Sequence, residues 1–298
     1  MRRLVFAALA MAATPARAHG GHEHAIGWTF DAQVTLPLAL ALGLYLIGLT
    51  RLRSRSARGR GELARGAWLY LGGWAVLAGA LVSPLHEAGE VSFTMHMVEH
   101  ETIMLGAALL LVAARPGPVL LWGLPAAARQ AAAPVLRWRL WRALARPATA
   151  TAIQAAVLIV WHLPALFDRA LRSEAIHVVQ HVCFVASALL FWWAVLPLGE
   201  DRAGRLVSAL CLFVTSVIGG GLGALMTLGG SPWYPAYAAM GMTPFGLTPA
   251  EDQQLAGVIM WVPGGAFHLA AALIVLAGAL RSTPEGLDHR VGDRRQAT

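Results

Sequence analysis

Two pairs of histidines have the residue type and the spacing to bind a metal ion. His96 and His100 lie four positions apart, and so do His177 and His181. Residues at positions i and i+4 share one face of a helix, so each pair can direct two imidazoles toward the same ligand. Imidazole nitrogen is a good ligand for copper, zinc, iron and nickel. The two pairs therefore predict one shared metal site between two helices.

Four further residues are candidate ligands of the same site. Met97 and Glu99 lie within the first histidine pair, His162 lies at the end of a later apolar stretch, and His268 lies near the middle of the last one. Thioether sulfur and neutral imidazole together favour Cu(I). We therefore expect a Cu(I) site built from imidazoles, with the thioether and the carboxylate as additional partners.

Other cofactors and chemistries must be weighed against copper. Residues 96–100 also fit the H-x-x-E-H pattern of inverted zinc peptidases. That chemistry needs a third protein ligand and a water-filled cleft, and no separate helix offers an obvious one. Haem b with two axial histidines is a stronger alternative, because each pair could supply one of them. The sequence contains no evident nucleophile–base pair, so we expect that the protein is not an enzyme.

The composition indicates a protein that crosses a membrane several times. The 298 residues are 57% hydrophobic and only 13% charged. The net charge of +7 is the excess of 23 basic residues, all of them arginine, over 16 acidic ones, and the arginines cluster between apolar stretches. That distribution is a topology signal, and we expect no nucleic-acid partner. The two cysteines, Cys183 and Cys211, form no C-x-x-C motif, which excludes a disulfide framework and a two-cysteine copper site.

The first residues are typical of a secretory signal peptide. Arg2 and Arg3 precede an apolar core, and Ala16-Arg17-Ala18 is an A-x-A cleavage site, so we expect residues 1–18 to be removed. The mature chain would begin with a His-rich extracytoplasmic segment, residues 19–31. Its new α-amine, with His19 and His22, could chelate Cu(II).

The apolar stretches predict an all-α membrane protein, a seven-helix transmembrane bundle over residues 32–280 with a cytoplasmic tail at 281–298. The expected spans are 32–50, 66–83, 92–113, 149–167, 176–198, 206–228 and 254–280. The arginine-rich loops fall on one side, so we expect the N-terminus outside and the C-terminus in the cytoplasm. The histidines would then lie in the outer half of the bundle.

Three local patterns make further predictions. Thr248-Pro249-Ala250-Glu251 is a capping box with proline at the first helical position, so the last helix should begin at Pro249. The glycine-rich residues 219–223 should allow close helix packing. Two helical hairpins, each with a histidine near its turn and a His pair one turn into the next helix, suggest a duplicated unit.

An ordered set of motifs resembles one known family. The matching residues are His96-Met97-x-x-His100, Trp161-His162-x-Pro164, His177-x-x-x-His181, Asp252-Gln253-Gln254-Leu255-Ala256-Gly257 and Met260-Trp261-x-Pro263-Gly264. In order and spacing, residues 30–280 resemble the CtaG cytochrome c oxidase assembly factors of the caa3-oxidase type. The resemblance implies a bacterial plasma-membrane protein that is needed to assemble haem-copper oxidases and is thought to act in copper delivery. Glu99 and Glu101 depart from the expected pattern and add acidic groups beside the ligands.

Together, these features predict a copper-binding membrane assembly factor that helps deliver copper to a cytochrome c oxidase. The expected partners are an oxidase subunit, a soluble extracytoplasmic copper chaperone and membrane lipid. A haem b redox protein and a copper permease are the alternatives. A permease would need ligands along its whole path, and the cytoplasmic half offers little beyond Cys211.

Overall fold

The computed structural model describes residues 26–55, 59–136, 139–196 and 201–281, and within these ranges the chain is all-helical. Six of its helices are long and apolar enough to cross a membrane. These are α1 (Ala32–Arg55), α2 (Arg60–Val82), the continuous α4–η1–α5 (Phe93–Glu101, Thr102–Ala107, Ala108–Ala113), α11 (Glu174–Val195), α12 (Arg202–Leu228) and the continuous α14–η2–α15 (Pro249–Ile259, Met260–Gly264, Gly265–Arg281). The segments η1 and η2 are π-helical. The predicted signal peptide, His19, His22 and the tail after Arg281 lie outside the described residues.

The predicted span at residues 149–167 is not one straight helix. The chain forms α9 (Pro147–Trp161) and α10 (Pro164–Arg172), which are bent by 73° at the break between them. Pro164 stands at the start of α10, where a missing backbone N–H is tolerated, but it could not have continued α9. The described residues therefore contain six candidate spans, or seven if this bent pair crosses the membrane as one.

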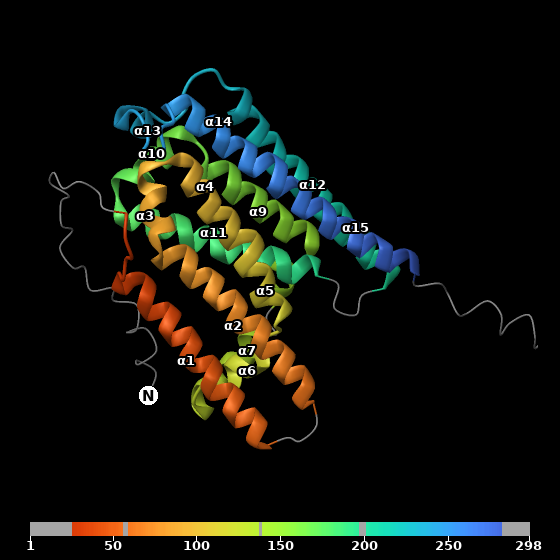
Figure 1. The fold of residues 1–298 in the computed structure, drawn as a ribbon. Helices are drawn as coiled ribbons and strands as arrows, with labels where there is room; N and C mark the ends of the chain where they lie inside the picture. Colours follow the sequence, from red (N-terminus) through yellow and green to blue (C-terminus); the bar gives the residue numbers. More distant parts are fainter. Residues whose placement is uncertain (1–25, 56–58, 137–138, 197–200, 282–298) are drawn as a thin grey trace, which may run out of the picture.

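Short helices gather at one end of the bundle. They are α3 (Pro84–Val91), α10 and α13 (Pro235–Met240), as Figure 1 shows. Toward the other end lie α6 (Gly117–Gly123) and α7 (Ala126–Leu136), which are followed in the chain by α8 (Arg139–Leu144). Helix α3 joins α2 to α4, and α10 joins α9 to α11. Each histidine pair therefore lies on the second long helix of a unit made of a long helix, a short helix and a long helix.

Glycine lets the C-terminal helices pack closely. A Cβ atom at Gly223 of α12 would lie 2.6 Å from the carbonyl oxygen of Gly257 in α14, and one at Gly220 would lie 3.3 Å from the Trp261 ring. Larger residues at these positions would push the two helices apart. The predicted packing role of residues 219–223 is therefore confirmed at these two glycines.

The predicted capping box at the start of α14 is confirmed. The Thr248 side chain accepts a hydrogen bond from the Glu251 backbone N–H, and the Glu251 carboxylate accepts one from the Thr248 backbone N–H. Helix α14 begins at Pro249, as expected. The fixed start of α14 determines where Asp252, one residue after the capping box, contacts the neighbouring helix α4.

Candidate metal centre

Helix α4 is held at its N-terminus by a carboxylate from α14. Asp252, which is 2% exposed, accepts hydrogen bonds from the Ser92 hydroxyl at 2.8 Å and from the backbone N–H groups of Phe93 at 2.6 Å and Thr94 at 3.1 Å. Ser92 is also the N-cap of α4. A negative charge at a helix N-terminus satisfies its free N–H groups and its dipole. The start of α4, and with it the register of His96 and His100, is set by this contact.

The two predicted histidine pairs meet across the interface between α4 and α11. The ring centroids of His100 and His181 lie 5.2 Å apart. Those of His96 and His177 lie 5.6 Å apart, with the rings nearly parallel. Within the pairs the separations are 4.2 Å on α4 and 4.5 Å on α11. The four imidazoles form one cluster, as the i,i+4 spacing indicated.

A fifth histidine, which was not among the predicted ligands, completes the cluster. His86, on the short helix α3, places its ring 5.4 Å from that of His177 and 5.6 Å from that of His181. The available signal was its position at the turn of the first repeated hairpin, two residues after Pro84. The cluster thus comprises His86, His96, His100, His177 and His181, and we call it the imidazole cluster.

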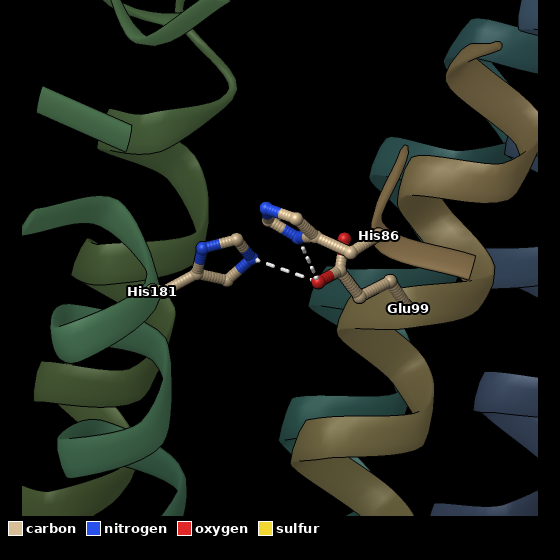
Figure 2. Close-up of side chains that lie close together, drawn as sticks. All are labelled: His86, Glu99 and His181. Atoms are coloured by element: carbon tan, nitrogen blue, oxygen red, sulfur yellow. Dashed lines mark hydrogen bonds and ion pairs between the residues drawn. The ribbon is translucent and has the colours of Figure 1, made fainter. Parts of the chain in front are cut away.

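Glu99 supplies a carboxylate to the imidazole cluster. Its side chain is fully buried, and its Oε1 atom accepts a hydrogen bond of 2.8 Å from Nδ1 of His86. Nε2 of His181 lies 3.4 Å from the same oxygen, so one carboxylate atom faces imidazoles from α3 and α11 (Figure 2). The other oxygen, Oε2, has no hydrogen-bond partner. A buried carboxylate at this depth is costly unless cationic groups surround it.

The donor atoms lie close enough to share a metal ion. His86, Glu99 and His181 each offer one ligand atom, and these atoms lie within 4.8 Å of one another. His86, Glu90 and His177 form a second such group, so His86 belongs to both. Metal–nitrogen bonds of about 2 Å place ligand atoms roughly 3–4 Å apart in a trigonal or tetrahedral site. Small movements would convert the observed separations of 2.8 and 3.4 Å into such a site.

Several nitrogen atoms of the cluster have no protein partner. Both ring nitrogens of His96 and of His100 are buried without a hydrogen bond, and so is Nε2 of His177. The amide of the neighbouring Gln180 is also buried, and neither its oxygen nor its nitrogen is paired. Buried polar atoms are normally satisfied, so this many unpaired atoms in one place is typical of a binding site.

The remaining predicted ligands lie around the cluster or apart from it. His162 directs Nδ1 to the Leu158 carbonyl oxygen at 2.7 Å, and its ring packs near those of Phe167 and Phe184. Met97 is buried in the hydrophobic core. His268 stacks on Trp192, with centroids 5.8 Å apart, and lines a different cavity. The structure therefore does not bring His268 into the imidazole cluster, because depth along a helix does not determine which face a side chain occupies.

His86 lies on α3, the short helix that connects the membrane-spanning helices α2 and α4, and its surroundings favour its protonated form. Burial lowers the pKa of His86, but the hydrogen bond to Glu99 and the negative charges of Glu99, Glu90 and Glu87 outweigh it, so the pKa is raised. A metal ion would have to displace the proton that His86 shares with Glu99.

The sequence of the chain matches a known protein family. The model of the family described as cytochrome c oxidase caa3 assembly factor (Caa3_CtaG) matches residues 43–282. Uncharacterized proteins of Mycobacterium bovis and Mycobacterium tuberculosis are each 29% identical over 251 residues, which cover 78% of this chain and 36% of theirs. One of Mycobacterium leprae is 26% identical over 279 residues, covering 90% of this chain and 41% of its own.

The chain therefore spans about two-fifths of the length of these curated relatives. No solved structure matches it. The family match covers most of the chain, including all five histidines of the imidazole cluster and Glu99. This chain belongs to the cytochrome c oxidase caa3 assembly factor family.

Proposed function

We propose that this protein binds Cu(I) in the imidazole cluster and passes it to a cytochrome c oxidase subunit during assembly. The observation that carries the proposal is the convergence of His86, Glu99 and His181, with ligand atoms within 4.8 Å of one another. Copper is the cargo of the protein, and the role is delivery without catalysis.

Charge balance supports a monovalent ion. Neutral imidazoles contribute no charge, and Glu99 contributes one negative charge, so Cu(I) at this site gives a neutral complex. Neutrality matters because uncompensated charge inside a membrane protein is expensive. A divalent ion would leave one positive charge unless a second acid took part, and Glu90 belongs only to the second ligand group.

The ligand set also suits transfer. Imidazoles bind copper well, but a cluster without cysteine lacks the strong thiolate bonds that would retain it. Of the three proposed ligands, Glu99 is fully buried and 10% of the His181 side chain is exposed, whereas His86, at 13%, is the most exposed. It lies on α3, at the end of the bundle where the short helices gather (Figure 1). Copper would therefore enter and leave past α3, facing either a soluble chaperone or the oxidase subunit.

The packing argues against haem. An axial pair must hold a flat porphyrin between two imidazoles. Here the rings of α4 and α11 pack against each other at 5.2 and 5.6 Å, and the ring of His86 packs beside them. A porphyrin could not be inserted between these imidazole rings without separating α4 from α11.

We further propose that the bundle resides in the bacterial plasma membrane with α3, α10 and α13 on the outer side. This orientation follows from the arginines of the opposite loops. Deleting the gene in copper-limited cells should leave the oxidase subunits synthesised but the oxidase inactive, and added copper should restore part of its activity. Full oxidase activity in the copper-limited deletion strain would refute the proposal.

A further inference from the structure

Apart from the imidazole cluster, several side chains with donor atoms line a cavity beside α4. The cavity has a volume of about 30 Å³, enough for an ion or a water molecule. The side chains that line it and carry donor atoms include Glu101, Met104, Gln154, Met260 and His268. None of them belongs to the imidazole cluster. Glu99 and Glu101 lie two positions apart on one helix, so they point to nearly opposite faces.

The two π-helical segments of the described chain both border this cavity. Met104 belongs to η1, which begins directly after Glu101, and Met260 and Gly264 belong to η2. A π-helical turn widens the helix and rotates the side chains that follow it, and such turns occur often at functional sites. Both sulfur-bearing residues of the cavity lie on these segments.

The imidazole of His268 is oriented for binding. Nδ1 lies 3.0 Å from the Gly264 carbonyl oxygen, and because a carbonyl can only accept, Nδ1 carries the proton. Nε2 of the neutral ring therefore presents a lone pair. The Trp192 ring stacks on this imidazole at an interplanar angle of 6° and holds its plane.

Two further polar groups at the cavity lack partners. Oε2 of Glu101 is buried without a hydrogen bond, and so is Oε1 of Gln154, whose Nε2 donates to the sulfur of Met104 at 3.6 Å. The space for Glu101 depends on Gly264, since a Cβ atom there would lie 2.8 Å from Oε2. Unpaired buried polar atoms in an enclosed apolar region are typical of a site that takes up an ion or a water molecule.

We infer that this cavity is a second Cu(I) site, in which the thioethers of Met104 and Met260 and the imidazole of His268 bind the ion and Glu101 supplies the compensating negative charge. Two thioethers and one imidazole are soft and borderline donors, which suit Cu(I) and poorly suit Na⁺, Mg²⁺ or Ca²⁺. From His100 to Met104 is four residues of helix, about 6 Å of rise, so the second site lies about one turn farther along the continuous helix α4–η1–α5. The inference rests on the proposed function, because it assigns the same cargo to both sites.

The test is X-ray absorption spectroscopy of the purified full-length protein loaded with Cu(I) under reducing conditions, together with the copper content. The wild type should bind copper with sulfur as well as nitrogen neighbours. The double variant Met104→Leu/Met260→Leu should lose one copper per chain and all copper–sulfur scattering. Methionine to leucine preserves volume, so the fold should survive. Met226→Leu is the matched control, since Met226 is equally buried but does not line the cavity.

Each outcome separates the second site from the proposed function. Wild-type protein that binds copper with nitrogen neighbours alone would refute the second site and leave the imidazole cluster standing. The same refutation follows if the double leucine variant keeps its copper–sulfur scattering. Protein without bound Cu(I) in any form would refute both. In a Glu99→Gln variant, the copper–sulfur scattering should persist while the nitrogen-bound copper weakens.

Discussion

Replacing Glu99 with glutamine should weaken copper binding more than any other change of a single charge at this end of the bundle. Glutamine has nearly the same shape, so the contacts of α4 with α11 should remain. The change removes the only negative charge of the group formed with His86 and His181, whose nitrogens lie 2.8 and 3.4 Å from Oε1. It also puts an amide, a much weaker ligand, where the carboxylate oxygen stood.

The size of the effect follows from the interaction that is lost. An interaction with a charged group in a buried site contributes about 1.5–3 kcal/mol. At 1.4 kcal/mol per factor of ten, the Cu(I) dissociation constant of the imidazole cluster should rise roughly 10- to 150-fold. The measurement is competition of the purified protein with a coloured Cu(I) chelator of known affinity. The Met104→Leu/Met260→Leu background should be used, so that the titration reports the imidazole cluster alone.

The control removes a charge at the same end without touching the cluster. Glu174→Gln, in the first turn of α11, lies three residues before His177, and its hydrogen bond with Gln33 can be kept by the amide. This variant should bind Cu(I) within about twofold of wild type, as expected for a screened surface charge. Equal affinities of Glu99→Gln and wild type would refute the role of the carboxylate, and equal losses in both variants would reduce it to a general charge effect.

Three further predictions follow from the fold and the site. Asp252→Asn should destabilise the protein by about 1–3 kcal/mol, because it weakens charge-assisted hydrogen bonds at the start of α4; thermal unfolding in detergent measures this, and an unchanged midpoint would contradict it. Copper affinity should fall as the pH drops through the raised pKa of His86, because the copper ion competes with the proton for this imidazole. In the copper-free protein the effect is opposite: protonated His86 stabilises the fold below that pKa, and this stabilisation is lost at higher pH. In His86→Ala the loss of copper affinity should begin at a lower pH, and a pH profile identical to that of the wild type would argue against His86 as a ligand. Gly223→Leu should separate α12 from α14 and abolish folding into membranes, while the same change at Gly221, which has open space beside it, should be tolerated; protease resistance in membranes distinguishes them.

Periodicity within one helix was predictable from the sequence, whereas contacts between helices were only partly so. The i,i+4 pairs identified His96, His100, His177 and His181, and the structure places all four together. The spacing rule cannot identify His86, because its partner Glu99 lies 13 residues away on another helix. Pro164 is sufficient to predict the bend between α9 and α10, whereas the apolar run around it favours one straight span.

The second cavity shows a different limit. The position of His268 along α15 was predictable, but the side to which its ring points was not. The π-helical segments rotate the side chains that follow Glu101 in one helix and Ile259 in the other, relative to their positions in a regular α-helix. No residue pattern predicted η1. Face assignments based on 3.6 residues per turn therefore fail beyond these points.

Anomalous X-ray scattering at the copper absorption edge, from crystals of the Cu(I)-loaded full-length protein, tests the central claim most directly. The account predicts a peak between His86, Glu99 and His181, within bonding distance of the imidazole nitrogens and the carboxylate. Copper-loaded crystals with no anomalous peak inside the imidazole cluster would contradict it.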